Sequence, residues 1–452
     1  MIRKYIISLS SVLLLTGCGV YRHYERPEVR TENLYTQYES SDTTTIADKK
    51  WQELFTDPCL QKLMEQALVQ NTDLRVARLK TEEAKAVVQN AKLAYLPSAE
   101  LKAEGTVSRF DESTSKTYNL GAGTSWEIDL FGKLTAAKRE AAAALESSEA
   151  YRQAVQTQLV STVADSYYTL LMLDRQLNIN TETQKNWTAT VRVLEALKKN
   201  GRSNEAAVLQ ARANLIALEN AEITLRKSIS ETENALSSLL AMPSQHIERG
   251  VLDNQTFPEN LSVGVPLQLM SKRPDVRQAE SELARAFYAA NVARAAFYPS
   301  VNLAGTAGWT NNGGGIIINP GQWLLNAIGS LTQPLFNRGT NMANLKIAKA
   351  QQEQATLLFQ QSLFNAGEEV NNSLTQLQSA RKRMANDRRQ IDILKEAVRK
   401  TELLMRHSPN ATYLEVLTAQ QSLLEAENTL AQDRFDEIQG IIHLYHALGG
   451  GL

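Results

Sequence analysis

Two segments of the chain carry a mixed polar and apolar pattern over nearly seventy positions with almost no helix-breaking residue. Neither glycine nor proline occurs from Lys133 to Lys199, and the stretch from Thr340 to Arg406 contains only Gly367. Each segment can form one continuous α-helix, about 100 Å long at 1.5 Å per residue. Helices of this length do not belong to a globular enzyme core.

Apolar residues in the second segment recur every seven positions, and the shorter segment that follows continues the repeat. A seven-residue repeat favours left-handed supercoiling of neighbouring helices. We therefore predict that each long helix forms a coiled coil with a shorter returning helix. The repeat positions are Leu363, Val370, Leu377, Met384, Ile391, Val398 and Met405, followed by Leu417, Leu424, Ala431, Ile438 and Tyr445.

Four short segments alternate with a period of two. From Ser98 to Ser108, small or apolar residues alternate with charged or polar ones. The same alternation occurs at 118–129 and 301–310, and less regularly at 323–333. This pattern predicts strands with one apolar and one polar face, as a transmembrane β-barrel requires. A soluble hairpin packed against the helices is the alternative interpretation.

The two halves of the chain are related by an internal duplication. One constant offset, without a gap, pairs Asp73 with Asp275 and Pro97 with Pro299. Each half therefore predicts a helix, two strands, one very long helix and a shorter returning helix.

Four strands cannot close a barrel, and an open sheet edge in lipid would leave backbone groups unsatisfied. Other copies of the chain must supply the missing strands. Two copies would give eight strands, whose interior side chains would fill the lumen, whereas three would give twelve with room for water. Three copies therefore suit a channel, which the long helices would continue as a tunnel.

Composition narrows the function classes further. The 452 residues carry a formal net charge of −1, so the chain has no excess of positive charge that would attract nucleic acid. No apolar run approaches twenty residues, so any membrane crossing must use a β-barrel. The sequence contains no catalytic constellation of residues, so we expect no enzyme activity and no cofactor. We also expect no metal, because His443 and His446 have no nearby third ligand. The basic residues Arg381, Lys382, Arg383, Arg388 and Arg389 are interpreted as a solvated helix face.

The first eighteen residues indicate export. Arg3 and Lys4 precede an apolar stretch that is too short to span a membrane and ends in Leu15-Thr16-Gly17-Cys18. This ending resembles the lipobox of bacterial lipoproteins, whose cysteine becomes acylated, so we predict lipidation of Cys18. The only other cysteine, Cys59, has no intrachain partner and is interpreted as a small buried apolar residue.

Taken together, these motifs resemble the TolC-like family of outer-membrane efflux channels, in its lipoprotein branch serving RND-type pumps. The resemblance implies a homotrimer with a 12-stranded transmembrane β-barrel, continued by a long periplasmic α-helical barrel. It also implies a lipid-anchored location in the cell outer membrane and two partners, a periplasmic adaptor protein and an inner-membrane RND transporter. The motifs are the lipobox, Ile128-Asp129-Leu130-Phe131-Gly132, Arg273-Pro274-Asp275-Val276-Arg277, the pair Leu93–Ser98 and Ala295–Ser300, and the closing Leu444–Gly451.

The expected domain organisation follows the duplication. We predict a signal peptide at 1–17, an anchored extended segment at 18–56, a first repeat at 57–242, an equatorial linker at 243–265 and a second repeat at 266–452.

The turns at the far ends of the long helices are the predicted functional sites. Asn200 and Gly201 form one turn and Pro409 and Asn410 lie in the other, and an adaptor would dock there. The family resemblance implies paired acidic residues just after the second turn, ringing a constriction. Glu415 matches the first of these, whereas Thr418 departs from the second and puts strong cation selectivity in doubt.

Two alternative functions remain open from the sequence. A channel of the same fold could serve an ABC-driven protein-secretion system, although the lipobox and the Arg273-Pro274-Asp275 motif disfavour it. A structural coiled-coil lipoprotein of the periplasm is the other alternative, disfavoured by two helical hairpins and duplicated strand pairs.

Overall fold

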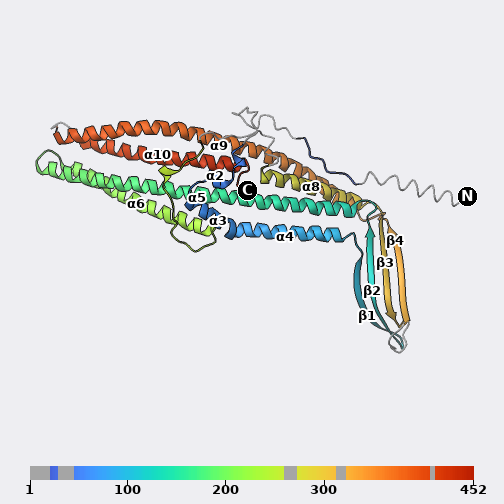
Figure 1. Cartoon of the computed structure of the whole chain (residues 1–452). Helices are drawn as coiled ribbons and strands as arrows, with labels where there is room; N and C mark the ends of the chain where they lie inside the picture. Colours follow the sequence, from blue (N-terminus) through green and yellow to red (C-terminus); the bar gives the residue numbers. More distant parts are fainter. Residues whose placement is uncertain (1–20, 29–44, 259–271, 312–321, 408–412, 452) are drawn as a thin grey trace. The chain divides into compact units, whose positions relative to one another are not determined.

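A computed structural model describes residues 21–28, 45–258, 272–311, 322–407 and 413–451 (Figure 1). They fall into two compact units, each built from both halves of the chain. The first unit contains residues 1–30, 79–150 and 277–362, and the second contains 31–78, 151–276 and 363–452. The two long helices therefore contribute residues to both units.

The order of elements repeats as the duplication predicts. In the first half, α4 (Thr72–Leu93) is followed by β1 (Ser98–Phe110), β2 (Ser113–Ile128), α5 (Lys133–Lys199) and α6 (Glu205–Leu239). In the second half, α8 (Pro274–Ala295) is followed by β3 (Ser300–Thr310), β4 (Gln322–Thr332), α9 (Thr340–His407) and α10 (Tyr413–Ala447). Shorter elements are η2 (Ile46–Asp48), α2 (Trp51–Leu54), α3 (Pro58–Gln70) and η3 (Leu252–Asn254).

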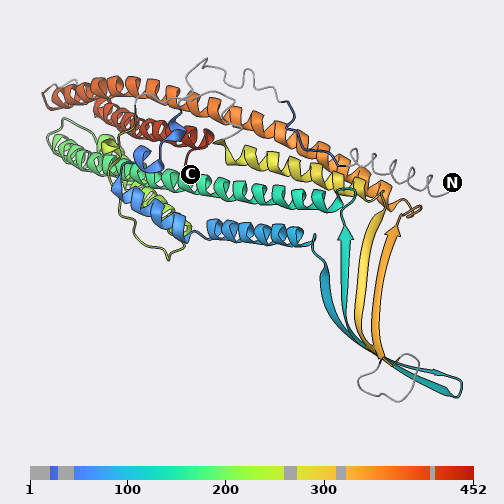
Figure 2. The same ribbon diagram turned by 45° about the vertical axis from the view of Figure 1, so that its right-hand side comes forward.

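The four strands of the first unit form one antiparallel sheet in the order β1-β2-β3-β4. Figure 2 shows the strands side by side. Residues that pair directly across neighbouring strands share a face. Leu101 pairs with Ala122, Trp126 with Leu303, and Ala307 with Leu325, so these residues lie on one face. Leu101 and Leu325 are more than four-fifths exposed in the single chain.

The opposite face of the sheet is polar. Here Glu100 pairs with Gly123, Glu127 with Asn302, and Asn302 in turn with Ser330. The register thus confirms the predicted alternation in the strands. Within the described part of the chain, β1 and β4 each pair with a single neighbour, so both edges of the sheet stay open.

Side-chain contacts attach the strands to the helices of the same unit. The Trp126 indole N–H donates to the carbonyl of Tyr95, and the Gln333 amide donates to the carbonyl of Phe297, both at 2.9 Å. Asp129 accepts hydrogen bonds from the backbone N–H groups of Leu134 and Thr135 at 3.0 and 2.8 Å, which caps α5. The motif around Asp129 therefore forms the junction between a strand and a long helix.

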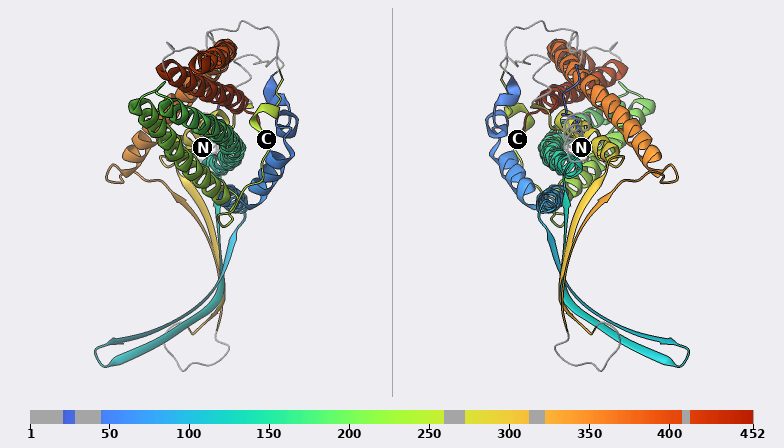
Figure 3. Two further views of the ribbon diagram at one scale, coloured as in Figure 1. Left: turned by 90° about the vertical axis from the view of Figure 1, so that its left-hand side faces the viewer. Right: turned by 90° about the vertical axis from the view of Figure 1, so that its right-hand side faces the viewer.

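The second unit holds the coiled-coil hairpins and their core. Figure 3 draws the hairpin helices as ribbons, α5 and α6 in green and α9 and α10 in orange to red. The predicted heptad positions from Leu363 to Ile391 are buried on α9, and Leu417, Leu424, Ala431, Ile438 and Tyr445 are buried on α10. Gly440 lies at a close approach of these two helices, since a Cβ atom there would be 3.1 Å from the backbone of Leu377. A larger residue at position 440 would therefore push α9 and α10 apart at this point.

A buried polar network ties the short N-terminal elements to the same unit. The Tyr167 hydroxyl donates to Asp57 Oδ2 at 2.7 Å, and the amide of Gln255 donates to the same oxygen at 2.9 Å. The backbone N–H of Gly250 donates to the Tyr167 hydroxyl. Burial raises the pKa of Tyr167 far above its ordinary value, so the phenol stays protonated and acts as the donor to Asp57.

One of the sequence interpretations was wrong, and a second was incomplete. Cys59 is only partly buried, because it is the second residue of α3 and its N–H donates to the N-cap Asp57. Arg381 and Arg383 do not form a merely solvated face, since they pair with Glu437 and Asp433 of α10 at 2.9 and 2.7 Å.

Candidate functional site: the hairpin ends and the membrane junction

The turn between α5 and α6 is built around a left-handed glycine. Gly201 has φ +71°, and the N–H of Arg202 donates to the carbonyl of Leu197 at 2.8 Å. These are the features of a helix that ends at a glycine C-cap. Asn204 then caps α6, because its side chain accepts from the N–H of Ala207. Asn200 and Gly201 are both exposed, so they form an accessible tip on this hairpin.

Glu415 and Thr418 lie on one exposed face at the start of α10. They are three residues apart, and the residues between them, Val416 and Leu417, are buried. Glu415 is in the first turn of the helix, where a carboxylate interacts favourably with the macrodipole. Since α10 begins at Tyr413, both residues lie within its first two turns.

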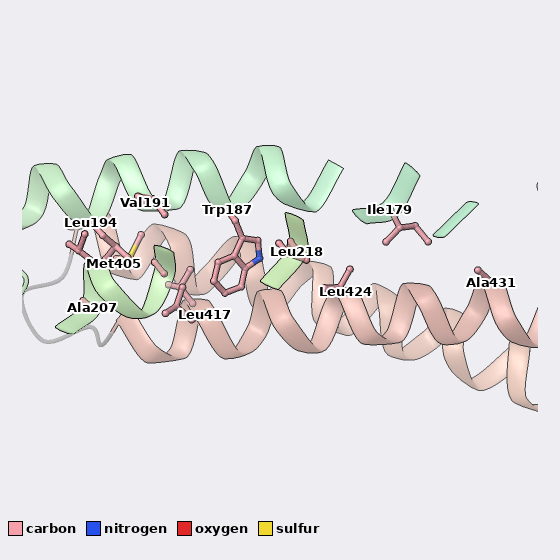
Figure 4. Packing of buried hydrophobic residues seen from close by; sticks show 13 residues of the cluster. Ile179, Trp187, Val191, Leu194, Ala207, Leu218, Met405, Leu417, Leu424 and Ala431 are labelled. Atoms are coloured by element: carbon pink, nitrogen blue, oxygen red, sulfur yellow. The ribbon is translucent and has the colours of Figure 1, made fainter. Parts of the chain in front are cut away.

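The core beneath these exposed residues is mainly apolar. Trp187 of α5, Met405 of α9 and Leu417 of α10 belong to one buried cluster, and Figure 4 shows their side chains between the hairpin helices. The Trp187 side chain is fully buried, and its indole N–H has no hydrogen-bond partner among the described residues. The cluster fixes the first turn of α10, and with it the exposed face that carries Glu415.

A polar contact interrupts this core. Gln420 is buried on α10, and its amide donates to Glu402 Oε1 of α9 at 3.0 Å and to the Thr190 hydroxyl of α5 at 3.2 Å. Buried polar contacts of this kind specify the register of packed helices. The face that bears Glu415 and Thr418 is therefore held in register with two neighbouring helices.

Arg273 makes a network that sequence reasoning missed. Its guanidinium, 4% exposed, pairs with Asp275 at 2.6 Å and with Glu369 at 2.7 Å, and it donates to the carbonyl of Ala447 at the end of α10. Burial opposes ionisation of Asp275, but the hydrogen bonds from Arg273 lower the pKa of that carboxyl. Burial and the Arg273 charge also lower the pKa of His446. The sequence showed only that Asp275 begins a helix, because Glu369 and Ala447 are distant along the chain.

The segment that follows Cys18 lies against α8 within the first unit. The ring of Tyr24 contacts that of Phe287 edge to face, with 5.7 Å between centroids. Arg26 forms a two-pronged ion pair with Glu280, at 2.5 and 2.7 Å. Tyr21 lies beside Gly132, where an added Cβ would come within 3.0 Å of the Tyr21 Cβ. The segment is thus fixed next to the junction of β2 and α5.

Three of the predicted site residues lie outside the described residues: Cys18, Pro409 and Asn410. No helix in the described part of the chain combines the length and the hydropathy that a membrane span requires. Within the same residues, no group of three or more His, Cys, Asp or Glu side chains could hold a metal ion.

The sequence profile of the family described as outer membrane efflux protein matches residues 63–242 and 265–450. The chain belongs to this family. It is 30% identical to the probable outer membrane lipoprotein SilC of Salmonella typhimurium over 463 residues, covering 100% of this chain and 99% of the relative. It is also 30% identical to the cation efflux system protein CusC of Escherichia coli K12, covering 97% of each chain.

Solved structures of such channels match the fold. A CusC structure superimposes with a TM-score of 0.85 at 28% identity, covering 95% of this chain and 99% of the other. The open state of the MtrE channel of Neisseria gonorrhoeae gives a TM-score of 0.86, also at 28% identity, covering 95% and 98%. The expected fold is confirmed: three chains contribute four strands each to a transmembrane β-barrel, and their long helices continue it as a periplasmic helical barrel.

The function follows from the family and the fold. The protein is an outer-membrane efflux channel of the kind used by tripartite RND systems, extending from the outer membrane into the periplasm. It is a duct and not an enzyme. The open edges of β1 and β4 and the exposed apolar sheet face are what this assembly covers, with neighbouring protomers and lipid respectively.

Proposed function

We propose that this channel is closed at the far end of its helical barrel by the start of α10, with Glu415 lining the constriction and Thr418 beside it. The observation that carries the proposal is the exposed face that Glu415 and Thr418 share over the buried cluster of Val416, Leu417 and Trp187. A threefold axis would bring three Glu415 carboxylates together. Thr418 adds no charge, so the ring holds three acidic groups and not six.

The hairpin tips are proposed to receive the periplasmic adaptor. Gly201 exposes backbone at the α5–α6 tip, and Asn200 presents an amide there that donates to the carbonyl of Ala196. Pro409 and Asn410 are proposed as the corresponding tip between α9 and α10. The inner-membrane RND transporter would deliver small molecules, drugs among them, which then pass through the channel without further chemistry.

Cys18 is proposed as the acylated residue. Acyl chains on this residue would enter the same membrane as the barrel, and two or more chains give stable anchoring. We also propose the domain boundaries predicted from the sequence, which fall after residues 17, 56, 242 and 265.

Recordings from the purified trimer in a planar bilayer test the gate. Glu415→Gln is expected to lower the preference for cations and to weaken block by polyvalent cations, because it removes three negative charges from the narrowest part of the path. Glu425→Gln, ten residues further along the same helix, is the matched control and should leave block unchanged. Block that is the same in wild type and Glu415→Gln would show that Glu415 serves only as a helix-start residue.

A further inference from the structure

The first unit contains a pair of arginines held by one buried amide. Asn291 is 2% exposed on α8, and its Nδ2 donates to the backbone carbonyl of Arg22 at 2.8 Å. Its Oδ1 accepts from the guanidinium of Arg294 at 2.6 Å. A single side chain thus fixes the N-terminal segment beside the last turn of α8, with Arg22 and Arg294 adjacent.

The two arginines repel one another. Burial lowers the pKa of Arg294, and the charge of Arg22 lowers it further. A third guanidinium, that of Arg139 on α5, acts electrostatically on Tyr21, the residue next to Arg22. In the described part of the chain, no ion pair joins Arg22, Arg139 or Arg294 to a carboxylate. Arg22 and Arg294 therefore interact electrostatically, Arg139 lies near the same N-terminal segment, and none of the three is paired with an acid among the described residues.

Further from the strands, the basic residues of the same elements are paired. Arg26 binds Glu280 and Arg285 binds Glu282 at 2.8 Å. The sequence explains the difference, because no Asp or Glu occurs between Glu282 and Glu353, whereas this stretch contains five basic residues. The stretch from the last turns of α8 through the start of α9 therefore carries an excess of positive charge.

This level of the molecule coincides with the periplasmic surface of the outer membrane. Arg294 precedes the start of β3 at Ser300 by six residues, and Arg139 lies in the second turn of α5, shortly after β2 ends. Since the strands form the transmembrane barrel, residues just beyond the strand ends are expected at the depth of lipid phosphates. A guanidinium matches a phosphate with two parallel hydrogen bonds, and clusters of basic residues at a membrane surface attract anionic lipids.

We propose that Arg22, Arg139 and Arg294 form a binding site for the phosphate of an anionic phospholipid, such as phosphatidylglycerol, in the periplasmic leaflet of the outer membrane. The site is organised by Asn291 and exists only when the N-terminal segment lies on α8. The bound lipid neutralises the arginines and holds the segment that carries the acylation site next to the membrane surface. The site rests on the outer-membrane location of the channel and is independent of the gate.

Native mass spectrometry of the delipidated trimer tests the site. Wild-type trimer is titrated with dioleoyl phosphatidylglycerol or dioleoyl phosphatidylcholine, and retained lipids are counted. We expect at least a roughly fivefold preference for phosphatidylglycerol, the effect of about one arginine at a membrane surface. R22Q/R294Q should abolish the preference, whereas R388Q/R389Q, which removes two exposed arginines elsewhere on α9, should keep it.

Two further measurements make the outcome decisive. R22K/R294K retains the positive charges but lacks the planar guanidinium groups, so this variant should keep part of the preference for phosphatidylglycerol if the arginines bind lipid. Inorganic phosphate should not compete with the lipid at equal concentration. Equal retention of both lipids by wild type, unchanged preference in R22Q/R294Q, or displacement of the lipid by phosphate would each overturn the proposal. Unchanged cation preference and block in Glu415→Gln would refute the proposed gate and leave this site standing.

Discussion

The carboxyl groups of Asp387 on α9 and Asp433 on α10 lie against one another, and one oxygen of each is buried with no hydrogen-bond partner in the described structure. Arg383 binds the other oxygen of Asp433 at 2.7 Å and also reaches Asp436. Nearby, Glu437 pairs with Arg381 and Arg434. Four acids therefore face three arginines, which leaves one negative charge that a proton on Asp387 can neutralise.

The pH dependence of the free energy of unfolding should reveal proton binding at Asp387. Burial, and then the contact with Asp433, raise the pKa of Asp387 to about 6. A raised carboxyl pKa means that the folded state binds the proton more tightly than the unfolded state. Its stabilising contribution is present in full below the unfolded pKa near 4 and is lost as pH rises through about 6, at about 1.4 kcal/mol per pKa unit.

Asp387→Asn should remove this dependence. The amide can donate to Asp433 at any pH, so the variant should unfold at a higher temperature than wild type at pH 7.5 and at a similar temperature at pH 4.5. Thermal unfolding of the detergent-solubilised trimer across this range measures the effect. Asp392→Asn, an exposed position on the same helix, should keep the wild-type profile. An identical pH profile for wild type and Asp387→Asn would rule out proton binding at Asp387.

The Arg273 network should contribute to the stability of the second unit. Arg273→Ala removes charge-assisted hydrogen bonds to Asp275 and Glu369 and uncaps the carbonyl of Ala447. Both carboxylates are nearly half exposed, so water can replace part of the lost hydrogen bonding. We therefore expect the free energy of unfolding to fall by about 1–3 kcal/mol.

Urea unfolding of the trimer measures this cost, with Arg388→Ala as the exposed control. Arg273→Lys should fall between wild type and Arg273→Ala, since lysine keeps the charge but cannot bind two carboxylates and a carbonyl at once. A loss no greater than that of Arg388→Ala would show that the network adds no stability.

Local signals allowed the elements to be predicted from the sequence. The absence of glycine and proline predicted α5 from Lys133 to Lys199, and these are its bounds in the structure. Period-two alternation located the strands, and Gly201 marked a turn because glycine tolerates the positive φ that ends a helix. Each of these properties depends on a residue and its immediate neighbours along the chain.

Contacts between distant residues could not be predicted in the same way. Arg381 and Arg383 looked like a solvated face, because Asp433 and Glu437 are about fifty residues away in sequence. Asn291 gave no signal in the sequence, since its role depends on Arg22 reaching it from the other end of the chain. The gate pair was predicted only through family resemblance, because Glu415 alone also fits a helix start.

The two faces of the sheet should respond oppositely to charge. Leu325 is 84% exposed in the single chain and pairs with Ala307, whereas the next residue, Asn326, lies on the polar face opposite Thr306. Leu325→Arg should cost about 2–4 kcal/mol per chain, because the charge would enter lipid near mid-membrane. Asn326→Arg should be tolerated. The yield of heat-resistant trimer in detergent measures both, and equal yields would contradict the assigned faces.

Acylation at Cys18 should be separable from folding of the barrel. Cys18→Ser is expected to abolish metabolic labelling with palmitate while the trimer still forms, because the strands hold the assembly in the membrane without lipid chains. Cys59→Ser is the matched control and should keep the label. Label that persists in Cys18→Ser, or a wild-type protein that takes up none, would refute the lipoprotein assignment of this residue.

Substitution of Gly201 should loosen the α5–α6 tip through backbone strain alone. A Cβ at this position would meet nothing within 4 Å, but φ is +71°, which costs an alanine about 1–2 kcal/mol. Gly201→Ala should therefore speed amide hydrogen exchange at residues 197–206 and leave the rest of α5 unchanged. Gly201→Asn should cost less, since asparagine adopts left-handed geometry more readily. Equal exchange in the two variants would indicate that the turn can relax, and the tip would then not depend on glycine.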